Sequence, residues 1–322
     1  MNKDMKKFAL QLLILILIVL SLIVIGLIII TQLQVEKYRT SYQYVINRKY
    51  EHLVNTNEPK VILIGGSNLA FGIDEGVIEE RIGIPVVNLG LHAGFGIRFN
   101  TEISKANINE GDIIVLAYEY SILNDLSYFT PELVVSGIDN NIEMYKYVPN
   151  EYWTGIIKYI PTYILKKIDA IDEKKITEIY NTKSFDEDGN MILQRNKCIL
   201  PEDITPNYSE VRFNDENNIS DEAVKYINDF YEFCIKKGAT VLYSFPSILD
   251  ERFYATKEQI EAYEQEVDEE LLPTRISSIN DYVFERKYMY DTILHLNSEG
   301  ANIRSRRLAD DILKYLLSER KK

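Results

Sequence analysis

The sequence predicts an α/β fold: a three-layer α/β/α sandwich built on a parallel sheet and preceded by one N-terminal transmembrane helix. Short runs rich in β-branched residues alternate with amphipathic segments, which is the pattern of a parallel sheet covered by helices on both faces. Hydrophobic residues make up 46% of the 322 residues, enough to bury a large core. Residues 8–30 contain no charged side chain.

The charge-free segment at residues 8–30 predicts the transmembrane helix. As a helix it would span roughly 35 Å, which exceeds the hydrocarbon core of about 30 Å. No small-residue cleavage site follows, so we expect an uncleaved signal anchor. A tight lysine cluster and a short tail favour a cytoplasmic N-terminus, although basic residues also follow the segment. We therefore expect a single-pass protein of the cell membrane, with residues 1–34 as tail and anchor and the remainder on the extracytoplasmic side.

Hydrophobic periodicity predicts the remaining elements. Continuous apolar runs predict buried strands at residues 60–65, 85–88, 112–117 and 240–245. Apolar spacing and capping residues predict helices at residues 75–82, 99–108, 220–237 and 298–317.

These elements divide the chain into an anchor, a stalk and one domain. Residues 35–57 are polar and rich in Tyr and Arg, and we expect them to form a stalk that continues as helix. Residues 58–322 are expected to form the α/β domain. The pattern weakens at about residues 121–217, which hold five of the nine prolines and the only tryptophan, so we expect an insertion there.

Composition excludes several classes of function. Acidic residues outnumber basic ones by 49 to 36, which gives a net charge of −13. Because binding to nucleic acid depends on Lys and Arg neutralising phosphates, we expect no nucleic-acid partner. Two cysteines and three histidines are too few for a disulfide scaffold, a four-thiolate zinc site or a His-rich metal centre. We expect neither a metal nor a cofactor.

Ser67 is the first candidate for chemistry, in the segment Gly65-Gly66-Ser67-Asn68 after the first predicted strand. Side chains at such a turn project from the carboxyl edge of a parallel sheet, where open α/β folds bind ligands. The two glycines permit a tight turn, and nearby backbone amides can face a developing oxyanion. The alternative is a serine that caps a helix; Asn68 is a candidate substrate contact.

His295 is the second candidate, and it lies just before the last predicted helix. A general base must be held in one tautomer, usually by a carboxylate on its other ring nitrogen, and Asp291 is near enough in sequence to do this. The alternative is a structural histidine at a helix start. His92, between two glycines in a predicted loop, is either a substrate contact or an ordinary loop residue.

Together these motifs resemble the SGNH (GDSL-like) hydrolase superfamily over about residues 58–317. The first family block resembles residues 65–68, Gly90 resembles the glycine of the second block, and Asp291 with His295 resembles the last block. The resemblance implies an SGNH-hydrolase-like domain with Ser67 as nucleophile, His295 as base and Asp291 as its partner. It also implies an oxyanion hole made by the backbone amides of Ser67 and Gly90.

The sequence departs from the family pattern in three places. The usual Gly-Asp-Ser reads Gly-Gly-Ser, and three residues instead of two separate Asp291 from His295. After the third strand, where the family has an Asn that donates to the oxyanion, the chain has Glu119. An ionised Glu cannot donate. We expect Glu119 to point away, toward Tyr120 or a basic group; the alternative is that burial raises its pKa so that it can donate a proton.

The anchor and these departures resemble the membrane-bound SGNH proteins of cell-envelope polysaccharide O-acylation, which are partners of membrane-bound O-acyltransferases. This resemblance implies an extracytoplasmic acyltransferase or esterase that acts on O-acyl groups, chiefly O-acetyl groups, of a cell-envelope polysaccharide. The acidic surface favours a neutral polysaccharide over a polyanion, which it would repel. The alternatives are a non-catalytic assembly or polymer-binding protein on the same fold, and a free-standing carbohydrate esterase.

Trp153 and the tyrosines around it are a further candidate for substrate contact. Aromatic rings gathered in one stretch of the insertion can form a platform on which sugars stack, or they can belong to the core.

Overall fold

The computed structural model describes residues 3–171, 179–202, 210–213 and 218–320. Its centre is a five-stranded parallel sheet in the order β2-β1-β3-β5-β8, which confirms the predicted α/β class. The strands of this sheet are β1 (Val61–Gly65), β2 (Val86–Asn88), β3 (Ile113–Ala117), β5 (Thr240–Tyr243) and β8 (Thr274–Arg275). Two short parallel pairs lie outside it: β4 (Val211–Arg212) with β7 (Phe253–Tyr254), and β6 (Ile248–Leu249) with β9 (Val283–Phe284).

β1 and β3 are the centre of the sheet and are buried along their whole length. Their apolar, largely β-branched residues suit a strand that is covered on both faces. Gly65 pairs with Ala117, so the two strands end at the same level. Residues that follow β1 and β3 by the same number of positions therefore meet at the carboxyl edge of the sheet.

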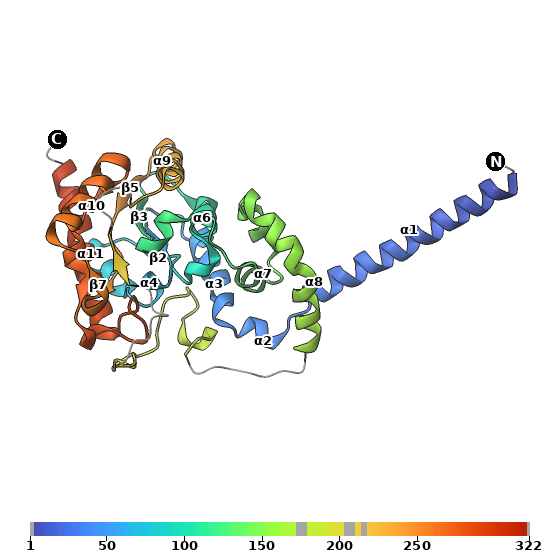
Figure 1. The fold of residues 1–322 in the computed structure, drawn as a ribbon, viewed down its shortest axis with the longest axis horizontal. Helices are drawn as coiled ribbons and strands as arrows, with labels where there is room; N and C mark the ends of the chain where they lie inside the picture. The colour runs from blue at the N-terminus through green and yellow to red at the C-terminus, as the bar shows by residue number, and fades with distance from the viewer. Residues whose placement is uncertain (1–2, 172–178, 203–209, 214–217, 321–322) are drawn as a thin grey trace.

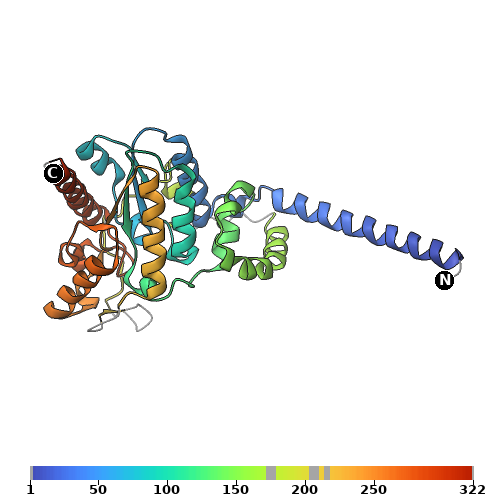
Figure 2. The same cartoon turned by 90° about the horizontal axis from the view of Figure 1, so that it is seen from above.

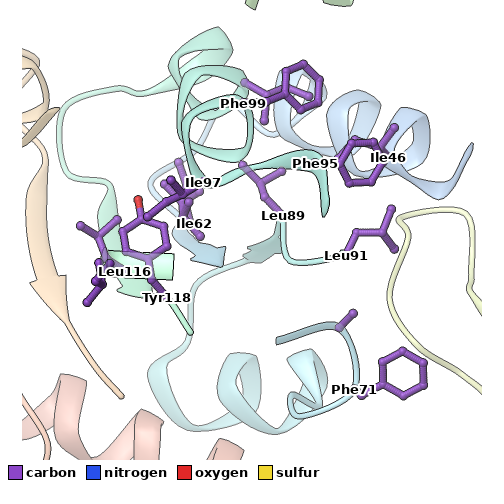
Figure 3. Packing of buried hydrophobic residues seen from close by; sticks show 14 of the residues in the cluster. Ile46, Ile62, Phe71, Leu89, Leu91, Phe95, Ile97, Phe99, Leu116 and Tyr118 are labelled. Carbon is purple, nitrogen blue, oxygen red and sulfur yellow. The ribbon is translucent and has the colours of Figure 1, made fainter. Parts of the chain in front are cut away.

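Helices cover both faces of the sheet because alternate strand residues point to opposite sides. On one face Leu63 and Val115 pack with Leu308 of α11 (Ser298–Glu319), and α5 (Glu75–Ile82) joins the same cluster. On the other face Ile62, Leu116 and Phe99 belong to one large hydrophobic core (Figure 3). The helices on that face are α3 (Val45–Asn55), α6 (Ile97–Ser104) and α9 (Asp221–Lys236).

Residues 35–57 are largely helical, as expected, but they pack into the domain and do not form a stalk. They form α2 (Glu36–Arg39), a 3-10 turn η1 (Tyr42–Tyr44) and α3, and their apolar residues belong to the main core. Inside the domain, Lys49 Nζ donates to the Asn88 carbonyl at 2.7 Å. The polar composition of this segment suggested exposure to solvent. Tyr and Lys side chains can nevertheless bury their apolar parts while their polar ends find partners.

α1 (Lys3–Gln32) is long and apolar enough to cross a membrane, and its most apolar stretch packs against no other described part of the chain. It projects from the domain as a single straight helix (Figures 1 and 2). Between α1 and the sheet lie two helices of the expected insertion, α7 (Pro131–Ile138) and α8 (Trp153–Asp169).

The remaining elements complete the insertion and the domain. Residues 172–178, 203–209 and 214–217 of the insertion lie outside the described residues. The remaining helices are α4 (Ser67–Ala70), α10 (Lys257–Glu270) and the 3-10 turns η2 (Ala93–Phe95), η3 (Lys105–Asn107), η4 (Tyr120–Asn124), η5 (Ile142–Tyr147), η6 (Asn150–Tyr152), η7 (Thr182–Ser184), η8 (Asp250–Arg252), η9 (Ile279–Tyr282) and η10 (Arg286–Tyr288).

Candidate active site

A cavity of about 1430 Å³ lies at the carboxyl ends of β1 and β3. The chain leaves β1 toward β2 on one side and later returns to place β3 on the other, so the strand order reverses between β1 and β3. Open α/β sheets bind ligands at such a switch point. Four of the residues singled out in the sequence line this cavity: Ser67, His92, Glu119 and His295.

Ser67 is the first residue of the short helix α4, directly after β1. The two glycines before it are needed because a side chain at either position would clash with the end of β3. A Cβ at Gly65 would lie 2.4 Å from the Ala117 carbonyl oxygen, and one at Gly66 would lie 2.6 Å from Glu119 Oε1. Both glycines therefore let the turn after β1 approach the end of β3.

Glu119 points toward Ser67, so the expectation that it points away was wrong. Ser67 Oγ donates to Glu119 Oε1 at 3.5 Å, and the Asn68 backbone N–H donates to the same oxygen at 3.4 Å. Burial raises the pKa of Glu119 above its ordinary value, while His295 and the bonds from Asn68 and Ser67 oppose the shift. The burial and raised pKa of Glu119 fit the alternative given above, although its oxygen is the acceptor in both of these hydrogen bonds.

His295 and Asp291 form a hydrogen-bonded pair in the loop before α11. His295 Nδ1 lies 2.8 Å from Asp291 Oδ1, and the imidazole stacks on Phe71 with ring centroids 4.1 Å apart. The other carboxylate oxygen, Oδ2, accepts from the Tyr180 hydroxyl at 2.5 Å. These contacts hold the ring in place and assign the Nδ1 proton to the bond with Asp291, which leaves Nε2 as an acceptor.

The pKa of Asp291 lies below its ordinary value. Burial alone would raise it, but the hydrogen bond and charge of His295 and the bond from Tyr180 outweigh burial. Asp291 is therefore ionised at neutral pH, as a carboxylate that orients a histidine must be.

His92 lines the cavity as a neutral imidazole. Its Nδ1 accepts from the Gly94 backbone N–H at 2.8 Å, so the ring proton lies on Nε2. Burial lowers the pKa of His92, and the nearby His295 adds to the shift. The cavity therefore contains a second histidine that can donate a hydrogen bond through Nε2.

The Asn68 side chain, expected to contact substrate, and the Gly90 backbone amide, expected to face the oxyanion, both have partners within the protein. Asn68 is fully buried; its side chain donates to the Ala117 carbonyl at 3.2 Å and accepts from Arg304 at 3.0 Å. The Gly90 backbone N–H donates to Asn88 Oδ1 at 2.9 Å. Asn68 thus joins the sheet edge to α11, and the amide that meets Glu119 is that of Asn68, not that of Gly90.

Trp153 belongs to the insertion and not to the cavity wall. Among the described residues that line the cavity, α8 contributes Lys166 and Asp169 instead. Trp153 packs against the main core beside Tyr145, with ring centroids 6.0 Å apart. The expected sugar platform around Trp153 is therefore core packing.

Sequence reasoning missed Tyr180 and Phe71, which position the histidine pair. Tyr180 lies 111 residues before Asp291 in the insertion, so no local pattern links the two. Phe71 follows Ser67 by one helical turn, and the sequence alone indicates only that it is a core residue.

Within the described ranges, no group of three or more His, Cys, Asp and Glu side chains is placed to hold a metal ion. No family model matches the chain, and no curated protein matches it.

Proposed function

We propose that this chain is a membrane-anchored SGNH-type acyltransferase or esterase acting on O-acyl groups, chiefly O-acetyl groups, of a cell-envelope polysaccharide. The observation that carries the proposal is the presence of Ser67 and the His295–Asp291 pair on one cavity at the sheet edge. A serine hydroxyl, a base and a carboxylate that orients the base are the groups that covalent acyl transfer requires. Helices on both faces of a parallel sheet support the SGNH-like three-layer arrangement.

The proposed reaction begins when His295 Nε2 takes the proton of Ser67 Oγ. The oxygen attacks the acyl carbonyl carbon, and the tetrahedral intermediate collapses when the leaving alcohol takes the proton from His295. The acyl group is then bonded to Ser67. In the second half, a sugar hydroxyl or water loses its proton to His295 and attacks the acyl-serine. The bond between the acyl carbon and Ser67 Oγ then breaks, and Oγ takes the proton from His295, which restores the free enzyme.

Glu119 in its protonated form supplies a donor for the oxyanion in this proposal. A neutral carboxyl has an O–H, and burial favours that form by raising the pKa of Glu119. The Asn68 backbone N–H donates to Glu119 Oε1 and so holds the carboxyl beside Ser67. Activity then needs Glu119 protonated and His295 neutral at the same time.

The anchor gives the proposed reaction its location. α1 would hold the domain at the extracytoplasmic face of the cell membrane, where a membrane-bound O-acyltransferase would act as the partner that delivers the acyl group. The lysines in the first turns of α1, before its charge-free stretch, support this orientation.

A nucleophile test in cells addresses the proposal directly. Ser67→Ala should abolish O-acylation or deacylation of the envelope polysaccharide, measured as ester content of the isolated polymer. Ser136→Ala is the matched control, because Ser136 lines the same cavity but donates to the Glu132 carbonyl of its own helix. Unchanged polymer esters in a folded Ser67→Ala protein would contradict the proposal.

One observation favours a second function, a polymer-binding protein without catalysis. An ionised Glu119 beside Ser67 would oppose negative charge on a carbonyl oxygen and would hold the Asn68 amide for itself. In that case Ser67→Ala would leave the ester content of the polymer unchanged and would keep polymer binding, which co-sedimentation of the variant with the isolated polymer measures.

A further inference from the structure

The helix α8 exposes a row of apolar side chains. The exposed fractions are 61% for Ile157, 64% for Leu165 and 41% for Ile168, and Pro161 is also exposed. Their spacing of three or four residues puts all four on one face of the helix. Single exposed apolar residues are ordinary on a soluble surface, but a continuous row along one helix marks an interaction site.

The surface of α8 divides into three faces. Ile156 and Tyr163 are buried against the domain. Lys158 and Thr162 are exposed and polar, and they lie beside the apolar row. A helix whose outward side is part apolar and part basic has the composition of a helix that lies in a membrane interface.

Contacts fix α8 at the point where α1 ends. Lys167 Nζ donates to the Thr31 carbonyl, in the last turn of α1, at 2.8 Å. The same amine pairs with Asp139 at 2.5 Å, and both charged side chains are fully buried. α8 crosses the direction of α1 instead of continuing it (Figure 1), and the two helices are neighbours in both views (Figure 2). A bilayer spanned by α1 would therefore have its surface beside α8.

We propose that α8 lies on the surface of the bilayer that α1 spans, with Ile157, Leu165 and Ile168 inserted among the upper parts of the lipid acyl chains. Lys158 reaches the lipid phosphates. The inference rests on the anchoring part of the proposed function and is independent of catalysis.

Docking of α8 on the bilayer would fix the orientation of the cavity relative to the membrane. Lys166 and Asp169 of α8 line the cavity that contains Ser67, and so do Lys37 and Tyr38, which closely follow α1. With α8 on the bilayer, this wall of the cavity lies at the membrane surface. A substrate carried by a membrane partner would then reach Ser67 without leaving the membrane surface.

Fluorescence quenching by brominated lipids tests this inference. The full-length chain, with Cys198→Ser and the buried Cys234 retained, carries a bimane label at Leu165→Cys or Ile168→Cys. It is reconstituted into vesicles of phosphatidylcholine and phosphatidylglycerol. The acyl chains are brominated near the headgroup for the α8 positions and near the chain end for Leu20→Cys. Thr162→Cys, on the polar face of the same helix, is the matched control, and Leu20→Cys in α1 reports anchoring.

We expect quenching at Leu165→Cys and Ile168→Cys that exceeds quenching at Thr162→Cys by roughly twofold or more, as insertion of one helix face requires. Equal quenching at the three α8 positions, with strong quenching at Leu20→Cys, would overturn docking while leaving the anchor intact. Absence of quenching at Leu20→Cys would overturn both the anchor and the docking that depends on it.

Discussion

The carboxyl of Glu119 lies 3.5 Å from the hydroxyl of Ser67. Each residue follows the last residue of its strand by two positions, and those last residues, Gly65 and Ala117, are paired in the sheet. The contact also needs Gly66, whose missing side chain leaves room for the carboxyl. A buried acid beside the proposed nucleophile is therefore built into the register of the sheet.

Glu119→Gln should keep esterase activity and extend it to higher pH. In the natural chain, activity should fall as pH rises through the raised pKa of Glu119, because the carboxyl then loses the proton it donates. A Gln amide donates at every pH, so this decline should disappear. Hydrolysis of an aryl acetate by the full-length chain across pH measures the effect.

The matched variant for this prediction is Glu119→Ala, which removes the donor. Its kcat should fall by about 10²-fold, the usual cost of losing one oxyanion donor. Equal activity in Glu119→Ala and the natural chain would show that Glu119 takes no part in the reaction.

Ser67 and His295 should behave as one unit. Ser67→Ala, His295→Ala and the double variant should show similar residual acyl transfer, because a nucleophile and its base lose most of their effect when either is removed. Initial rates with the aryl acetate give the comparison, and circular dichroism checks folding. Additive losses in the double variant would contradict the pairing.

Asp291→Asn should lower kcat by about 10²-fold or more, because the amide no longer fixes the tautomer of His295. Tyr180→Phe removes only the second bond to the carboxylate and should have a smaller effect. If Tyr180→Phe lost as much activity as Asp291→Asn, Tyr180 would have a role beyond positioning.

Asp291 also makes the stability of the domain depend on pH. Its pKa is lower in the folded chain than in the unfolded chain, so its contribution is present above the ordinary Asp pKa of about 3.9 and is lost as pH falls below it. Thermal unfolding should show that Asp291→Asn reduces this acid sensitivity.

The anchor should place the domain outside the cytoplasm. Protease added to intact protoplasts should digest the chain after α1, while a cytoplasmic marker protein stays protected. Protection of the domain until the membrane is lysed would reverse the proposed orientation.

The sheet and its main helices could be predicted from the sequence because their signals are local. β1, β3, α5, α9 and α11 have continuous apolar runs or regular apolar spacing with caps, and each was expected within a few residues of its observed bounds. β8 has only two residues, Thr274 and Arg275, which is too short for a periodic pattern.

The parts that sequence reasoning placed wrongly depend on tertiary contacts. The polar composition of residues 35–57 predicted a solvent-exposed segment, yet Tyr42 and Lys49 are buried with hydrogen-bond partners inside the domain. The direction of Glu119 depends on space left by Gly66 in another strand connection. The platform expected around Trp153 failed because an aromatic cluster in sequence does not reveal which rings face solvent.

The most direct test of the central claim is the detection of an acyl-enzyme at Ser67. The full-length chain is incubated with an aryl acetate, quenched in acid and analysed by peptide mass spectrometry. The account predicts an acetyl group on Ser67 that forms slowly or not at all in His295→Ala. Acetylation at other residues only, or labelling of Ser67 that His295→Ala leaves unchanged, would contradict the assignment of Ser67 and His295 as nucleophile and base.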